Sequence, residues 1–457
     1  MLYAVLVYLI IFTILSFRVF NDIMSPTVII GLTMIFGTVI ACIGNINWCI
    51  EIPVDILIVY LLGTFFLFIG EAVATNNKKK IVIKCGATYI TSQNRFLKPN
   101  NIPFKYTLVL FIFTLVVAVL CERIYINIAY TFGYTGESWQ SLQKYIKEAL
   151  MYRNARLGMG LATAYSIVTV LAYIFLEFFT INCCYNGIKN TIKKHWFYLL
   201  PVFSYVYVNN VQGQRSGYIG LISFVIFSYF IANSAINNKK INVMKFVKYG
   251  LIAVLLFIIV FVISAVENGR LQESNAIESV KIYAGSAIVD LANYFNNGAE
   301  HTEKIGQSTF PGLRSTISRF IPINNNMKSV FGFVRFANGS YSNVYTAFGH
   351  YYADFGYIGI VFFSFLSGYL YKRLYNNTKG ENISYGALYI YSYLTYGLVM
   401  TFIAEQQFTM FMSVNQLMHF FFAYFLLNIF VKKFVVLQSQ TKGEVYENIG
   451  RNSIIQP

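Results

Sequence analysis

Residues 249–266 read YGLIAVLLFIIVFVISAV, a run that contains no charged side chain. A helix of this length covers about 27 Å, close to the roughly 30 Å of a bilayer's hydrocarbon core. The run therefore predicts a membrane-spanning helix. The composition agrees, because 56% of the 457 residues are hydrophobic, 18% are aromatic and only 12% are charged. These values lie outside the range of soluble proteins and indicate a membrane protein.

Similar apolar runs recur along the whole chain, so the expected fold is an all-α polytopic membrane protein with about 11 transmembrane helices. The first run begins at Met1 without a basic segment or a small-residue cleavage site, which favours a retained span over a cleaved signal peptide. The six cysteines lie in or beside spans and predict no disulfide framework. The expected spans are Leu2–Phe17, Pro26–Cys42, Pro53–Ala74, Tyr106–Ala129, Leu161–Ile181, Trp196–Val208, Tyr218–Ala235, Tyr249–Val266, Tyr351–Tyr371, Tyr385–Ala404 and Ser413–Val431.

Basic residues gather in every second connection, which orients the chain by the positive-inside rule. On this basic face lysine outnumbers arginine by eighteen to four, and we assign the face to the cytoplasm. The amino terminus is then expected outside and the carboxy terminus inside. The opposite face is rich in arginine, whose guanidinium group binds phosphate bidentately, so it is expected where an anionic lipid-linked substrate is held. Its arginines are Arg123, Arg153, Arg156, Arg215, Arg270, Arg314, Arg319 and Arg335.

The expected organisation has four parts. Residues 1–266 form a bundle of eight spans with an outer loop at 130–160, and residues 267–350 form a large outer loop that carries part of the active site. Residues 351–431 form the last three spans, and residues 432–457 form a cytoplasmic tail. Both outer loops are expected to be partly helical, because apolar residues recur at helical spacing between Trp139 and Leu150 and between Ile277 and Phe295. The first of these helices either lies in the membrane interface or is only structural.

Arginine at the outer membrane boundary is the first candidate for chemistry. Arg215 lies in QGQRSG (residues 212–217), which joins two expected spans, and a charge at that depth points to function. The flanking glycines favour close approach to a substrate phosphate, although a guanidinium that only reaches lipid head groups is the alternative. Arg270, Arg314, Arg319 and Arg335 in the large loop either join Arg215 in binding pyrophosphate or are solvated loop charges.

An imidazole and a carboxyl group follow at the start of the ninth expected span. Asp354 comes four residues after His350, so the two share one helical face if the helix has begun there. Either group can act as a general base. The alternative is a buried polar pair that fixes helix packing. The sequence has no zinc, haem, nucleotide or P-loop pattern, so no metal or cofactor and no nucleic acid partner is expected.

Several short segments carry a family resemblance. They are Gly213-Gln214-Arg215, then Tyr283-Ala284-Gly285-Ser286 and Arg319-Phe320-x-Pro322 in the large loop, then Asn343-Val344-Tyr345-Thr346, and finally Tyr352-Ala353-Asp354-Phe355-Gly356-Tyr357-x-Gly359. In this order the segments resemble the Wzy-type oligosaccharide repeat-unit polymerases of O-antigen and capsule synthesis. Some members carry arginine followed by glycine eleven positions later, and no arginine here has that spacing. The roles that this motif assigns are therefore not transferred.

The resemblance implies a GT-C-like helical fold in the bacterial inner membrane. The implied donor is a growing glycan on undecaprenyl pyrophosphate, and the implied acceptor is one lipid-linked repeat unit. A chain-length regulator and a flippase of the same pathway are the implied protein partners, and membrane lipid surrounds the spans.

We hypothesise a metal-independent, inverting displacement at the anomeric carbon, in which an acceptor hydroxyl attacks and undecaprenyl pyrophosphate leaves. The arginines would stabilise the developing charge, and His350 or Asp354 would accept the proton. An O-antigen ligase, a flippase or transporter of lipid-linked oligosaccharide, and a structural or sensor membrane protein are the alternatives. The expected glycan contacts are Tyr283, Asp290, Asn343, Tyr352 and Glu405.

Overall fold

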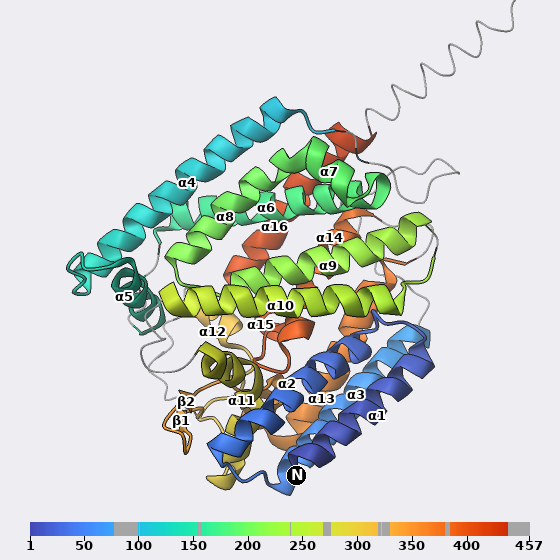
Figure 1. The fold of residues 1–457 in the computed structure, drawn as a ribbon, viewed down its shortest axis with the longest axis vertical. Coiled ribbons are helices and arrows are strands. Elements are labelled where there is room, and N and C mark those ends of the chain that lie inside the picture. Colours follow the sequence, from blue (N-terminus) through green and yellow to red (C-terminus); the bar gives the residue numbers. More distant parts are fainter. Residues whose placement is uncertain are drawn as a thin grey trace, which may run out of the picture.

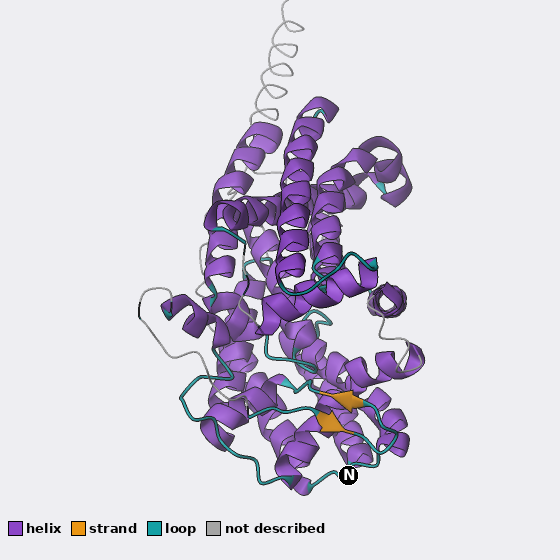
Figure 2. Cartoon of the chain, turned by 90° about the vertical axis from the view of Figure 1, so that its left-hand side faces the viewer, coloured by secondary structure: helices purple, strands orange, loops and turns teal. Residues whose placement is uncertain are grey.

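The protein is an all-α polytopic membrane protein (Figures 1 and 2). The computed structural model describes residues 1–76, 99, 101–152, 155, 157–237, 239–267, 276–318, 321, 330–379 and 384–436. Within these ranges the strands are limited to one antiparallel hairpin, in which β1 (Val334–Arg335) pairs with β2 (Tyr341–Ser342). Helices make up the rest of the regular structure.

The helices follow the apolar runs of the sequence closely. Eight of the described helices are long and apolar enough to cross a membrane, namely α1, α2, α3, α4, α6, α9, α13 and α16 with its extension to Val435. The other three expected spans overlap α8, α10 and α14, although Trp196–Val208 begins in η1 and Tyr385–Ala404 ends four residues beyond α14. The helix bounds are α1 (Leu2–Phe20), α2 (Pro26–Trp48), α3 (Val54–Asn76), α4 (Phe104–Thr131), α5 (Trp139–Tyr152), α6 (Met159–Asn186), α7 (Ile188–His195), η1 (Trp196–Leu199), α8 (Leu200–Val211), α9 (Ser216–Asn237), α10 (Val243–Glu267), α11 (Ala276–Asn296), α12 (Pro311–Ile317), α13 (Ala347–Asn376), α14 (Tyr385–Met400), α15 (Gln407–Met412), α16 (Val414–Val431) and η3 (Lys432–Val436).

Two groups of helices make up the bundle (Figure 1). Helices α1, α2, α3 and α13 form one group, and α4, α6, α8, α9 and α16 form the other. Helix α14 packs on both α9 and α2, while α10 packs on α9 and α11. The first group depends on glycine, because the backbones of α3 and α13 meet at Gly70 and Gly368. Small residues let membrane helices approach closely in this way.

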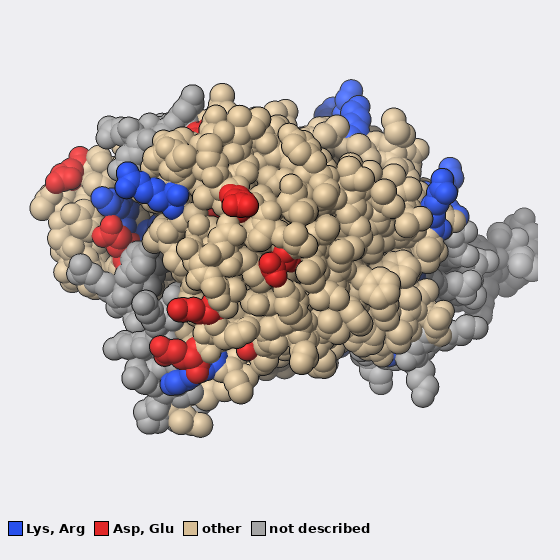
Figure 3. Space-filling model, turned by 90° about the horizontal axis from the view of Figure 1, so that it is seen from below, with Lys and Arg blue, Asp and Glu red and all other residues tan. Residues whose placement is uncertain are grey.

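The two ends of the bundle differ in character. The loop end is the one at which α5, α11, α12 and the β1–β2 hairpin lie, and the lysine end is the opposite one (Figure 1). On the face drawn in Figure 3, a broad uncharged belt separates a mixed group of acidic and basic side chains on the left from Lys and Arg on the right. This belt is the pattern expected of a surface that faces lipid.

A buried ion pair joins the helices of the first group at the lysine end. The ammonium of Lys372 lies 2.8 Å from the Glu71 carboxylate, and both side chains are almost fully buried. The same carboxylate accepts hydrogen bonds from the Ser25 hydroxyl at 2.7 Å and the Thr27 amide at 2.9 Å. A second pair joins Asp22, in the connection between α1 and α2, to Lys379, which follows the end of α13. Because each buried charge has a partner, the cost of removing it from water is offset.

Both predicted amphipathic helices of the loop end are present, as α5 and α11. The apolar face of α5 is buried inside the protein, because Leu142 is 4% exposed and Ile146 and Ala149 are 0% exposed. Helix α5 packs on α4. This packing favours the structural interpretation of α5 over a helix whose apolar face lies in lipid.

Candidate functional site

Arg215 lies at the end of a tight turn between α8 and α9 at the loop end. Gly213 adopts a φ of 62° there, a conformation that favours glycine. Two glutamines hold the turn: the Gln212 side chain donates to the Tyr125 hydroxyl at 2.7 Å, and the Gln143 side chain of α5 donates to the Asn210 carbonyl at 2.6 Å. The position of Arg215 is therefore fixed by α4, α5 and α8 together.

The guanidinium of Arg215 affects the pKa of the Tyr283 phenol in α11. Burial raises the pKa of the Tyr283 phenol, and the positive charge of Arg215 opposes that rise. The opposing effect requires the two groups to lie close together, since such interactions weaken with distance. The structure thus brings together two of the predicted substrate-binding residues, which are far apart in the sequence.

Asp290 is the buried acid of this region. Its side chain is 0% exposed, and its Oδ2 accepts hydrogen bonds from the Val344 amide at 3.1 Å and the Ser286 hydroxyl at 3.4 Å. Among the described residues no donor reaches its Oδ1 atom. Burial raises the pKa of Asp290 to about 8, so the group is mostly a neutral acid at pH 7. Asp290 therefore anchors the segment after β2 to α11 as a protonated carboxyl group.

This ionisation predicts how stability depends on pH. An aspartate in an unfolded chain has a pKa of about 3.9. Between about pH 4 and pH 8 the folded chain therefore holds a proton on Asp290 that the unfolded chain lacks. Folding stability should therefore fall as pH rises through this interval. We expect Asp290→Asn to weaken the fall, which is measured as the difference between thermal midpoints at pH 5 and pH 8. Equal differences in the variant and the wild type would contradict this ionisation.

His350 and Asp354 both lie in the first turns of α13, as the sequence predicts. Thr346 caps this helix by accepting from the Gly349 amide. Asp354 does not face open space, because its carboxylate holds the segment before α12. Its Oδ1 accepts from the Thr302 hydroxyl at 2.7 Å, its two oxygens accept from the Ser308 amide at 3.0 Å, and its Oδ2 accepts from the Thr309 amide at 2.6 Å.

These bonds give the two residues different capacities. With both oxygens of Asp354 engaged by backbone and hydroxyl donors, the carboxylate serves as an anchor, which favours the packing interpretation of this residue. His350 is partly buried, and its Nδ1 lies 2.7 Å from the Ser308 hydroxyl. If Nδ1 carries the proton and donates to Ser308, Nε2 keeps a lone pair that can accept a proton. Of the two predicted bases, His350 is the one whose side chain is not held by several hydrogen-bond donors of the segment before α12.

Removing the Asp354 carboxylate should release residues 301–310 from α13. Asp354→Ala leaves the Ser308 and Thr309 amides without their acceptor, at a cost of about 3 kcal/mol. We expect faster hydrogen exchange at these amides and faster proteolysis of the segment. Glu303→Ala is the matched control, since Glu303 is an exposed carboxylate in the same segment. Unchanged exchange in Asp354→Ala would show that the carboxylate has no anchoring role.

The other predicted site residues occupy varied places. Tyr352 lies in an aromatic cluster, with its ring centroid 4.6 Å from that of Phe295 and 5.4 Å from that of His301, both at a tilt. Glu405 caps α15, where it accepts from the Phe408 amide at 2.7 Å, and burial raises its pKa to about 7. Two of the predicted arginines, Arg270 and Arg319, lie outside the described residues. Three other predicted residues lie elsewhere at the loop end: Arg314 in α12, the exposed Arg335 in β1 and the exposed Asn343 after β2.

Helix α11 connects these groups. It carries Tyr283 and Asp290, and the residue after Asp290, Leu291, fills the space beside Gly349, next to His350. From Tyr283 to Leu291 the helix rises about 12 Å. Arg215 and the start of α13, which carries His350, thus lie against positions of α11 that are about 12 Å apart along its axis.

Sequence reasoning missed Thr302, Ser308 and Thr309, which bond to Asp354 and His350. They lie in a polar segment without periodicity, so no spacing links them to α13. Among the described residues, no group of three or more His, Cys, Asp or Glu side chains is placed to hold a metal ion.

Comparisons with known proteins add no identification. No family model, no curated protein and no solved structure matches the chain. The fold and the residues of the loop end therefore carry the functional argument.

Proposed function

We propose that the chain is a membrane glycosyltransferase that polymerises lipid-linked oligosaccharide repeat units. The donor would be a glycan on undecaprenyl pyrophosphate, and the product would be O-antigen or capsular polysaccharide at the outer face of a bacterial inner membrane. The resemblance of the short sequence segments supports this class. The observation that carries the proposal is that Arg215 and the start of α13, which carries His350, both lie against α11.

Arg215 has the chemistry needed at the leaving group. A guanidinium beside a phenol hydroxyl offers charge and hydrogen-bond donors to a diphosphate, and at an effective dielectric constant of 20 each close charge pair contributes about 4 kcal/mol. Because the leaving group gains negative charge as the glycosidic bond breaks, this stabilisation acts on the transition state.

His350 has the chemistry needed at the attacking hydroxyl. With Ser308 holding Nδ1, the imidazole Nε2 would take the proton of the acceptor hydroxyl as that oxygen bonds to the anomeric carbon. One displacement exchanges the pyrophosphate for the acceptor oxygen and inverts the configuration. The acceptor proton then passes from the imidazole to water.

The test is reconstitution of the purified full chain in vesicles with undecaprenyl-pyrophosphate-linked repeat units. A ladder of products on a gel, each longer by one unit, is the expected result. Transfer of preformed polymer to a different lipid acceptor without growth would indicate a ligase. Movement of the lipid-linked unit across the bilayer without any new glycosidic bond would indicate a flippase. Either of these outcomes would overturn the proposal.

A further inference from the structure

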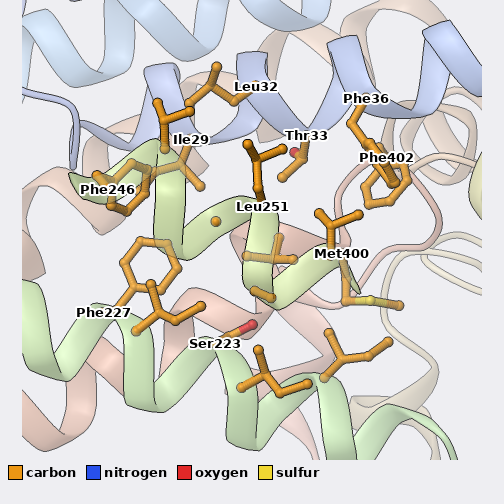
Figure 4. Close-up of a pocket in the computed structure, with 18 of the residues that line it drawn as sticks. Ile29, Leu32, Thr33, Phe36, Ser223, Phe227, Phe246, Leu251, Met400 and Phe402 are labelled. Atoms are coloured by element: carbon orange, nitrogen blue, oxygen red, sulfur yellow. The ribbon is translucent and has the colours of Figure 1, made fainter. Parts of the chain in front are cut away.

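An apolar pocket of about 340 Å³ lies between the two groups of helices (Figure 4). Its walls come from α2, α9, α10 and the end of α14, and Thr33 and Ser223 are the polar side chains among its lining residues. An apolar cavity of about 150 Å³ is enough to bind benzene. The pocket therefore has room for roughly two groups of that size, or for a length of hydrocarbon chain.

The pocket is open toward the surface that faces lipid. Val247 and Leu251 of α10 line it, and their side chains are 43% and 66% exposed. Leu251 belongs to the uncharged run 249–266, and Val247 lies one turn earlier in α10, between Lys245 and Lys248. Leu251 therefore offers a hydrocarbon chain an apolar entry from the bilayer.

Arg215 lies just beyond one edge of the pocket. Ile219, which lines the pocket, lies in the first turn of α9, and Arg215 is the residue just before this helix, four positions earlier. The backbone of Arg215 and this part of the pocket therefore lie at the same end of α9.

A second path links the pocket to the same charged group. Phe402 lines the pocket, and its ring lies against Gly37 of α2. Gly37 also faces the backbone carbonyl of Ala284, the residue after Tyr283. Tyr283 carries the phenol whose pKa is lowered by the charge of Arg215. Two separate sets of contacts therefore place the anion-binding group at the same edge of the apolar pocket.

We propose that this pocket holds the part of a polyprenyl chain nearest its diphosphate, with the diphosphate itself at Arg215 and Tyr283. This inference rests on the proposed function, which supplies a polyprenyl diphosphate as the lipid. Hydrocarbon binding there would hold the anomeric carbon at a fixed depth relative to His350. The chain beyond the pocket would continue into the bilayer through the opening between Val247 and Leu251.

Gly250 offers a way to fill the pocket without disturbing its walls. It lines the pocket from α10, and a Cβ atom added there meets no other atom within 4 Å. Gly250→Phe should occupy the space, with Gly250→Leu as a milder version. Leu255→Phe is the matched control, because Leu255 is on the same helix, is 57% exposed and does not line the pocket.

Binding is measured with labelled undecaprenyl diphosphate on the full chain in vesicles, with inorganic pyrophosphate and phosphatidylglycerol as competitors. We expect Gly250→Phe to weaken undecaprenyl diphosphate binding about tenfold or more, equivalent to losing contact with about two methylene groups, while Leu255→Phe matches the wild type. Inorganic pyrophosphate should compete equally well in both variants, and Arg215→Ala should weaken its competition.

Two results would overturn the proposal: wild-type affinity in both Gly250 variants, or displacement of the polyprenyl lipid by phosphatidylglycerol at equal concentration. The second would assign the pocket to ordinary membrane lipid.

The function is tested separately by the product ladder. If polymer forms although the Gly250 variants bind normally, the pocket proposal fails alone. If the pocket binds as expected but no polymer forms, the proposed function fails alone.

Discussion

The Arg215→Ala variant is expected to make no polymer, with only single repeat units left on the gel. Removing one preorganised donor from a site of developing negative charge lowers turnover about 100- to 1,000-fold in comparable enzymes. Arg215→Lys should restore part of the activity, because an ammonium supplies the charge without the bidentate fork. The ladder assay in vesicles measures both variants. The sequence gives the same expectation for Arg319→Ala.

The control for this variant is Arg123→Ala. Arg123 is an exposed arginine of α4 and belongs to the face that the sequence predicts to be rich in arginine. Its removal tests whether the loss of any positive charge on that face is enough to stop polymerisation. It should leave the ladder unchanged. A wild-type ladder from Arg215→Ala would remove Arg215 from the mechanism, and an equal loss in both variants would reduce its role to general surface charge.

Gly70→Ala and Gly368→Ala are expected to give little folded protein. A Cβ atom on Gly70 would lie 2.0 Å from the Phe365 carbonyl oxygen, and one on Gly368 would lie 2.1 Å from the Leu67 carbonyl oxygen. Because the obstructing atoms are backbone, α3 and α13 would have to separate. Overpacking of this kind costs about 3 kcal/mol or more. Thermal midpoints and the monodisperse yield in detergent measure the loss.

Gly160→Ala provides the comparison for these two variants. Gly160 lies in the first turn of α6, where an added Cβ atom meets nothing within 4 Å. Its midpoint should equal or slightly exceed that of the wild type, since alanine favours helix. Wild-type midpoints in Gly70→Ala and Gly368→Ala would show that α3 and α13 tolerate a wider separation.

The sequence predicts the helices well because hydrophobic length and periodicity are local properties. Each of the eleven apolar runs overlaps a helix, and α11 covers the stretch from Ile277 to Phe295, in which apolar residues recur at helical spacing. The start of α13 also agrees with the sequence pattern, since His350 and Asp354 both lie in the first turns of this helix. What spacing cannot supply is the partner of each residue.

The partners come from contacts between distant segments. Asp354 bonds to Thr302, which precedes it by 52 residues, and no local pattern marks either one for the other. A carboxylate expected to act as a base is therefore found holding a loop. The apolar pocket is equally invisible in the sequence, because its walls are ordinary membrane-helix residues that meet only when α2, α9, α10 and α14 assemble.

The buried pair of Glu71 and Lys372 has a consequence for biosynthesis. The two residues are 301 positions apart, so the ribosome delivers the carboxylate to the membrane long before it delivers the ammonium. Until α13 is inserted, the partners that the described residues provide for the Glu71 carboxylate are the Ser25 hydroxyl and the Thr27 amide. The packing of the first three helices can therefore be completed only after the last third of the chain has been synthesised. A truncated product lacking α13 would expose an uncompensated acid within the bilayer, which marks it as unfinished.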